Sequence, residues 1–155
     1  MPTAINQARP SHSLINAELF DRLVDRIVRD EDMTRPLATR VMDQALAFLA
    51  ACARDHGEPL APSPLVDIGW HTFLLHTRAY ALFCQDVAGR FLHHEPTEPA
   101  TLDRGEISET RRRTLAAIEA AGYSVDLDLW PGVHAECKQD CHQCHQGCSD
   151  SPKKK

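Results

Sequence analysis

Hydrophobic positions recur every three or four residues along most of the chain, a spacing that is typical of amphipathic α-helices. The pattern predicts four helical segments, which are residues 14–30, 36–54, 64–88 and 102–121. Ser13 and Ser63 are the expected N-caps of the first and third segments. Gly89 and Gly122 follow the last residues of the third and fourth. We therefore expect an all-α fold, a small bundle of about four helices.

The third segment is apolar around nearly its whole circumference when it is drawn as one continuous helix. A helix of this kind belongs in the middle of a protein, so we expect it to be central. His71 falls between its two apolar stripes, which predicts a buried imidazole. Asp67, one turn earlier on almost the same face, can accept one ring N–H. The other ring nitrogen is then available to a metal, a substrate proton or a structural hydrogen bond.

The loop after this segment contains the adjacent pair His93 and His94. Neighbouring side chains in a loop can point in different directions, so one of the two can face back onto the helix. Cys84, near the end of the segment, is expected to pack in the core as a small hydrophobic residue. His76 is the weakest ligand candidate, because an exposed surface position explains it equally well.

Residues 66–96 read VDIGWHTFLLHTRAYALFCQDVAGRFLHHEP. This stretch resembles the bacterial glycine-rich-domain-protein-like proteins, whose pattern combines V-D-x-x-W-H-T-F, Y-x-x-F-C and G-x-F-x-H-H-x-P. The resemblance implies no particular reaction, and this chain has no glycine-rich region. It does imply a polar or metal site, whose residues in this chain are Asp67, His71, Cys84, His93 and His94.

The C-terminal segment has a different composition, rich in cysteine and histidine and poor in apolar residues. Its cysteines have the spacing C-x3-C-x2-C-x3-C and are Cys137, Cys141, Cys144 and Cys148. Four thiolates with neighbouring imidazoles suit tetrahedral zinc, while Cu(I), an Fe–S cluster, disulfides or a tail without a tight-binding role are alternatives. The chain is thus expected to divide into a helical domain, 1–130, and a Cys/His-rich tail, 131–155.

Charge and hydropathy narrow the classes of partner. The net charge is −5, with 17 Lys and Arg against 22 Asp and Glu, so nucleic acid is not the expected partner. No apolar run is long enough to cross a membrane, and no secretory signal is evident, which predicts a cytoplasmic protein with reduced thiols. The oligomeric state is not predicted.

The sequence therefore favours a small cytoplasmic metal-binding protein with a His/Asp site in the bundle and a Cys/His site in the tail. Zinc is the expected ion, with iron or copper as alternatives. A second hypothesis is a hydrolytic or oxidative metalloenzyme that uses His71, His93 and His94. A third is a non-catalytic module that docks a protein partner, in which the histidine motif is structural.

Overall fold

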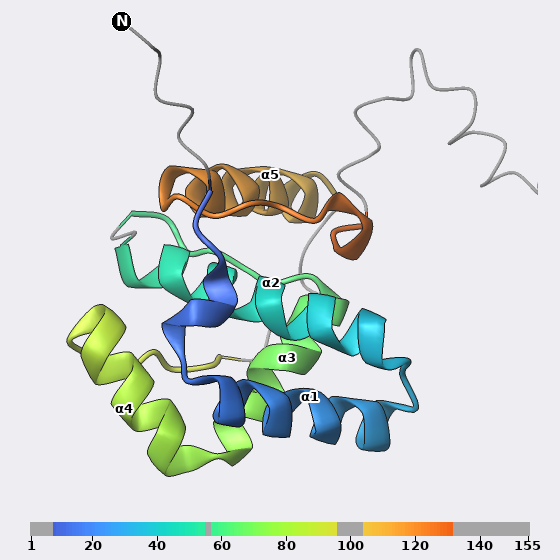
Figure 1. The fold of residues 1–155 in the computed structure, drawn as a ribbon. Coiled ribbons are helices and arrows are strands. Elements are labelled where there is room, and N and C mark those ends of the chain that lie inside the picture. Colours follow the sequence, from blue (N-terminus) through green and yellow to red (C-terminus); the bar gives the residue numbers. More distant parts are fainter. Residues whose placement is uncertain (1–7, 55–56, 96–103, 132–155) are drawn as a thin grey trace, which may run out of the picture.

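A computed structural model describes residues 8–54, 57–95 and 104–131, and it confirms an all-α bundle (Figure 1). The described part contains five α-helices rather than about four, together with two short 3-10 turns. The elements in chain order are η1 (Ser11–Leu14), α1 (Ala17–Glu31), α2 (Arg35–Arg54), α3 (Pro64–Leu75), α4 (Thr77–Ala88), α5 (Arg104–Ala120) and η3 (Leu127–Leu129). Because the description ends at Pro131, the predicted boundary between a helical domain and a tail stays a prediction.

The first helix begins later than expected. Ser13 lies in η1, where its hydroxyl donates to the Pro10 carbonyl at 2.6 Å instead of capping a helix. Asn16 is the N-cap of α1, and its side-chain oxygen accepts from the Leu19 backbone N–H at 2.8 Å. The prediction of Ser13 as N-cap was therefore wrong. Serine and asparagine both cap helices well, and the true cap, Asn16, follows Ser13 by three residues.

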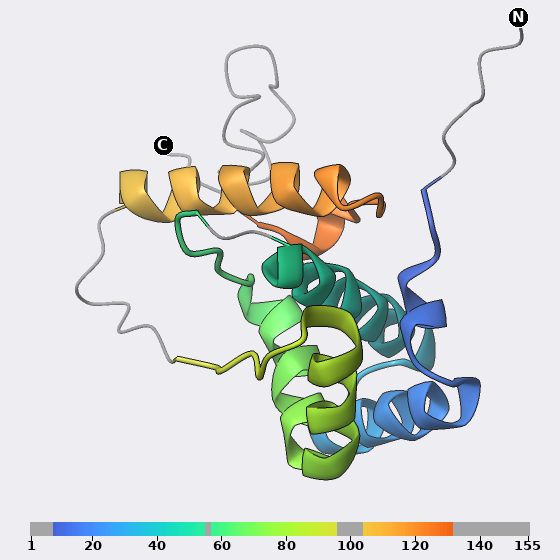
Figure 2. The same cartoon turned by 90° about the vertical axis from the view of Figure 1, so that its left-hand side faces the viewer.

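The central helix of the bundle is α2, not the third predicted segment. It contacts η1, α1, α3, α4 and α5, and most of its side chains are buried. Figure 1 shows α5 on one side of α2 and α1 with α3 on the other, and Figure 2 shows the same order from the side. The many alanines of α2 explain this position, because small side chains let four helices approach one axis.

The predicted third segment is two helices, α3 and α4, which meet at His76. The His76 backbone has φ −95° and ψ 69°, which is outside the helical range, and its N–H donates to the Phe73 carbonyl at 2.9 Å. α4 then turns back from the end of α3 (Figure 1). Phe73 packs against Tyr80 and Phe83, with ring centroids 5.2 Å apart in both pairs. The apolar residues that were predicted to surround one straight helix are thus divided between two helices.

Gly69 sets how closely α3 can approach α2. A Cβ atom at this position would lie 2.7 Å from the Ala45 Cβ and 3.1 Å from the Val41 carbonyl oxygen. Both distances are shorter than ordinary van der Waals contact. The glycine therefore lets α3, which carries Asp67 and His71, lie directly against the central helix.

The segment after α5 is fastened to α2 and α3 by buried polar groups. The Gln44 side-chain carbonyl accepts from the Trp130 indole N–H at 2.9 Å and from the Asp126 N–H at 3.0 Å. The Ser63 hydroxyl, which also caps α3, donates to the Leu129 carbonyl at 2.6 Å. Tyr123 forms an isolated bridge with Arg9, and η3 follows.

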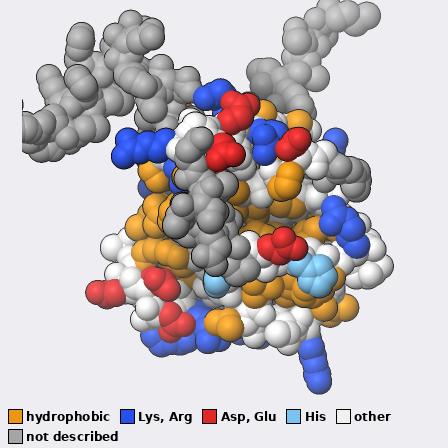
Figure 3. Space-filling view, turned by 180° about the vertical axis from the view of Figure 1, so that it is seen from behind, with side chains coloured by type: hydrophobic (Ala, Val, Ile, Leu, Met, Phe, Trp, Pro, Cys, Tyr) orange, Lys and Arg blue, Asp and Glu red, His pale blue; other side chains and the backbone are white. Residues whose placement is uncertain are grey.

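Hydrophobic side chains gather into a band across the face opposite that of Figure 1, and histidine and acidic side chains lie among them (Figure 3). Within the described ranges, no helix has both the length and the apolar character needed to cross a lipid bilayer.

Candidate functional site

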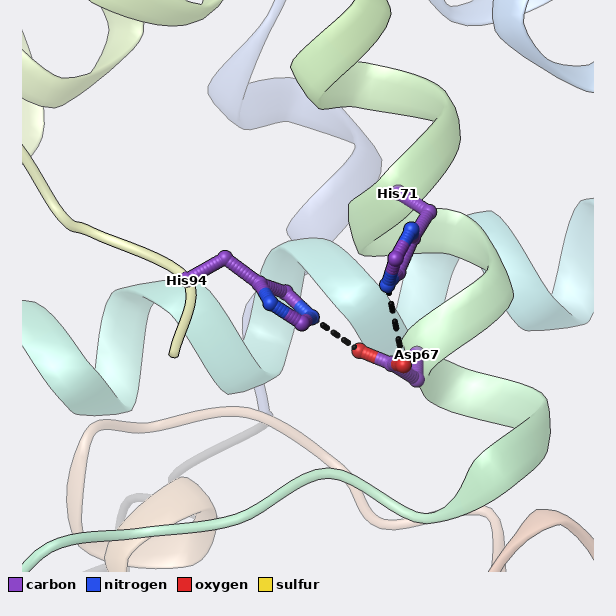
Figure 4. A group of neighbouring side chains, drawn as sticks. All are labelled: Asp67, His71 and His94. Carbon is purple, nitrogen blue, oxygen red and sulfur yellow. Dashed lines mark hydrogen bonds and ion pairs between the residues drawn. The ribbon is translucent and has the colours of Figure 1, made fainter. Parts of the chain in front are cut away.

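Three polar side chains of the sequence motif meet at one point beside α3 (Figure 4). The Asp67 carboxylate lies between two imidazoles: its Oδ2 is 3.2 Å from His71 Nε2, and its Oδ1 is 2.7 Å from His94 Nε2. One ligand atom from each residue lies within 4.8 Å of the others. Among the described residues, this is a group of acidic and histidine side chains that could hold a metal ion.

Asp67 and His71 are positioned by α3 alone. Ser63 caps this helix, and its hydroxyl accepts from the Val66 N–H at 3.2 Å, so Asp67 follows within the first turn. His71 lies one turn further, which brings the i, i+4 pair together as the sequence predicted. The His71 side chain is 59% exposed, however, so the expected burial was wrong. That expectation assumed one continuous helix, whereas the flanking apolar residues are divided between α3 and α4.

His94 comes from the loop after α4 and is the inner member of the cluster, with its side chain only 13% exposed. Its ring packs against the Trp70 ring, with centroids 4.3 Å apart, and meets the His71 ring edge-on at 4.4 Å. Packing on both sides leaves the His94 ring little rotational freedom, so its Nε2 atom is held facing Asp67.

A chain of buried hydrogen bonds, which we name the loop clamp, holds this loop in place. It consists of Trp70, Tyr80, Cys84 and Leu92. The Trp70 indole N–H donates to the Tyr80 hydroxyl at 2.9 Å, and that hydroxyl donates to the Leu92 carbonyl. The Leu92 N–H donates to the Cys84 Sγ at 3.4 Å. Burial raises the pKa of the Tyr80 hydroxyl far above its ordinary value, so the group stays protonated and able to donate.

The structure does not bring every predicted ligand into the cluster. Cys84 is buried and serves in the loop clamp, so its sulfur faces the Leu92 backbone. His93 is exposed, and its ring lies against Phe91 with centroids 4.8 Å apart. The four tail positions lie outside the described residues and are Cys137, Cys141, Cys144 and Cys148.

The sequence analysis did not single out Trp70 and Tyr80 as residues that position the site. Both side chains are indeed buried, but each also carries a polar group. A buried indole N–H or phenol hydroxyl needs a hydrogen-bond partner. That need was the available signal that these two residues act beyond simple packing.

The geometry suits either of two states of the cluster. Without a metal, each imidazole can donate an Nε2–H to a separate oxygen of Asp67. With a metal, one nitrogen of each imidazole and one oxygen of Asp67 would be the ligands. Neighbouring ligands on a tetrahedral zinc ion with bonds of about 2.0–2.1 Å lie about 3.3 Å apart. The observed distances of 3.2 and 2.7 Å end on different oxygens of Asp67, and one ligand atom from each residue lies within 4.8 Å of the others, so the side chains would have to move for one ion to bind all three.

Comparisons with known proteins place the chain at the level of a family. No curated protein and no solved structure matches it. One family model matches residues 11–119, a range that contains α1 to α4, the cluster, the loop clamp and nearly all of α5. Because this match covers more than half of the 155 residues, the chain belongs to the UCP032817-like family.

Proposed function

We propose that the protein binds a divalent transition-metal ion at Asp67, His71 and His94. The observation that carries this proposal is the convergence of two imidazole Nε2 atoms on one carboxylate, with all three potential ligand atoms within 4.8 Å. Two of these residues come from one helix, and the third is held by the loop clamp, so the arrangement is built into the fold. A purely structural ion pair at the surface would need no such support for its loop member.

Two nitrogen ligands and one oxygen ligand narrow the choice of metal. Imidazole suits zinc, iron, copper and nickel, whereas calcium and magnesium prefer sites built from oxygen atoms. Zinc is the first candidate, because three such residues match the ligand types of its known sites. Iron(II) is the second, because two histidines and one carboxylate with open positions is the ligand set of non-haem iron oxygenases.

The exposure of the cluster favours a second candidate function, a metal-dependent enzyme. Three protein ligands leave at least one coordination position for water or substrate, which is the arrangement of catalytic zinc sites. The 59% exposure of His71 leaves that side of the cluster in contact with solvent. A metal held here could activate a water molecule for hydrolysis or, if it is iron, bind an oxidant. The chain offers no observation that selects a substrate.

The resemblance of residues 66–96 to glycine-rich-domain-protein-like proteins is part of the same proposal. The motif residues of that resemblance supply the cluster and the loop clamp together, namely Asp67, Trp70, His71, Tyr80, Cys84 and His94. We infer that proteins with this motif share the site.

The test is zinc binding by the full-length protein, measured by metal analysis after dialysis and by competition with a chromophoric chelator. His71→Ala and His94→Ala each remove one ligand, and His93→Ala is the matched control beside the cluster. Changes to residues that only support a ligand typically weaken metal binding by about 10–100-fold, so removing a ligand should cost at least ~100-fold. The control should bind as the wild type does. The proposal is wrong if the wild type binds no zinc, or if all three variants retain its affinity.

A further inference from the structure

We propose that the protein binds a small organic ammonium ion, a primary amine with a short apolar body, in a cavity on the outer face of α2. The cavity shares no residue with the Asp67–His71–His94 cluster, so the inference goes beyond the proposed metal site and does not depend on it. Three observations support it: the place and size of the cavity, a carboxylate that is fixed at one oxygen and open at the other, and the charges and apolar side chains around it.

The cavity lies where four parts of the chain meet. Its walls are residues 8–12, Phe20 of α1, polar side chains of α2, and the segment that follows α5. Its volume is about 510 Å³, and sites for small molecules typically measure about 300–1,000 Å³. The walls are held in place, because η1 packs against both α1 and α2 and the Arg9 N–H donates to the Gly122 carbonyl at 2.8 Å.

One wall of the cavity is the polar stripe of a helix that is otherwise buried. Between residues 38 and 51, every position of α2 is buried except Thr39, Arg40 and Asp43. Residues three and four positions apart share a helix face, and all three of these side chains line the cavity. The central helix of the bundle is thus accessible to a ligand at this place.

Asp43 is the residue that binds the ammonium group. The buried Ser11 hydroxyl lies 2.7 Å from Asp43 Oδ1 and 2.8 Å from the Asp43 carbonyl oxygen, and the His12 N–H donates to Oδ1 at 3.1 Å. Oδ2 accepts no hydrogen bond from the described part of the chain, and the side chain is 35% exposed. A carboxylate that is already held in place loses little freedom when a ligand binds its open oxygen.

The charges around the cavity favour a cation. Arg40 is already paired, because its guanidinium donates to both oxygens of Asp126 at 2.7 and 2.8 Å and to Asp128 at 2.9 Å. With Asp43 and the exposed Arg9 included, three carboxylates stand against two guanidiniums. The open oxygen of Asp43 therefore attracts an ammonium ion and repels a carboxylate.

Apolar side chains provide a surface for the body of the amine. Ala8, Pro10 and Phe20 line the cavity, and the Phe20 ring lies 5.9 Å from the His12 ring. The face of an aromatic ring also attracts a cation. An apolar wall beside a few placed polar groups is the usual composition of a small-molecule site. The ligand class that fits is a primary amine on a short hydrocarbon body.

Three probes of nearly equal shape test this inference, namely isoamylamine, isoamyl alcohol and isovalerate. At about pH 8 they carry a positive charge, no charge and a negative charge. Each is titrated into isotope-labelled full-length protein, and the backbone amide signals are followed by NMR. We expect the amine to bind with a dissociation constant of about 0.1–10 mM and to shift the amides of residues 8–12, 39–43 and 124–126. The alcohol should bind at least about 10-fold more weakly, and isovalerate should not bind.

Two variants separate the charge of Asp43 from its structural role. Asp43→Asn keeps an oxygen that can accept from Ser11 and His12, so its urea midpoint should stay close to that of the wild type. It removes the charge, so it should weaken amine binding by about 10–100-fold. Asp25→Asn is the matched control, because Asp25 pairs with Arg35 and does not line the cavity. It should bind the amine as the wild type does.

The outcomes that overturn the inference are distinct. One is amine binding that is unchanged in Asp43→Asn, and another is binding of the alcohol or isovalerate as tight as that of the amine. Shifts centred on Asp67, His71 and His94 would place the amine at the metal cluster instead. No saturable shift up to about 50 mM amine would show that the cavity does not take this ligand class. If Asp43→Asn does not fold, the comparison of the three probes on the wild type decides.

Discussion

The loop clamp gives a direct test of what holds the inner histidine in place. Tyr80→Phe removes one hydroxyl and keeps the ring that packs against Phe73 and Phe91. The hydroxyl is the middle of the clamp, since it accepts from Trp70 and donates to Leu92. The substitution therefore breaks both bonds without opening a large cavity.

The expected magnitude follows from the groups that remain. The Trp70 indole N–H and the Leu92 carbonyl belong to residues that are 7% and 5% exposed, so solvent does not readily replace the lost partner. A buried polar group left without a partner costs about 1–3 kcal/mol. Two such groups predict a loss of about 2–4 kcal/mol from the free energy of unfolding, since a carbonyl left unpaired is tolerated better than an N–H. That is a large part of the ~5–15 kcal/mol typical of a domain.

Urea unfolding of the metal-free protein measures this loss, with Tyr123→Phe as the matched control. Tyr123 is also buried, at 7% exposure, but its hydroxyl makes no hydrogen bond within the part of the chain that the structure describes. The control should lose less than about 1 kcal/mol. Tyr80→Phe should also weaken zinc binding by about 10–100-fold, because it frees the loop that carries His94. Equal, small losses of unfolding free energy in Tyr80→Phe and Tyr123→Phe would show that the loop clamp does not stabilise the fold.

Three further changes test the scaffold, each by urea unfolding. Gly69→Ala should lower stability by up to about 2 kcal/mol. Overpacking against α2 costs about 1–3 kcal/mol, and the higher helix propensity of alanine offsets about 1 kcal/mol of that cost. A more stable variant would contradict the close approach of α3 to α2. Hydrogen bonds from Arg40 hold the pKa of Asp126 below its ordinary 3.8. The ionised carboxylate therefore stabilises the fold above about pH 4, and this contribution is lost as the pH falls through the lowered pKa. The stability advantage of wild type over Asp126→Asn should therefore shrink between about pH 7 and pH 3, and an advantage that grows would reverse the assigned sign. Ser63→Ala should cost about 2–4 kcal/mol, because it removes the cap of α3 and also leaves the buried Leu129 carbonyl without its donor. Ser13→Ala, outside any helix cap, should cost less than about 0.5 kcal/mol.

The sequence predicted the helices best where a local signal marks their ends. The class of fold is confirmed, and Ser63 and Gly89 do bound the α3–α4 stretch as N-cap and C-cap. The break at His76 was not predictable in this way, because the residues around it include neither glycine nor proline. Its cause is tertiary: turning back at His76 packs α4 against both α3 and α2.

The site was predictable only as far as helix spacing reaches. The i, i+4 relation of Asp67 and His71 is a property of one helix, and their contact is confirmed. Whether His93 or His94 joins the cluster depends instead on the path of the loop after α4. Contacts with Trp70 and Tyr80, which lie earlier in the sequence, hold that path. Two adjacent histidines in the sequence do not show which of them faces Asp67.

The two imidazoles of the cluster differ greatly in freedom, and this difference has a kinetic consequence. The His94 ring, 13% exposed and packed at a tilt against Trp70, has few rotamers left to lose. The His71 ring, 59% exposed, must give up rotational freedom when it binds. If the cluster binds a metal as proposed, His71 should therefore be the first ligand to dissociate. The rate of metal exchange would then be set by the rotation of one surface side chain, without any opening of the bundle.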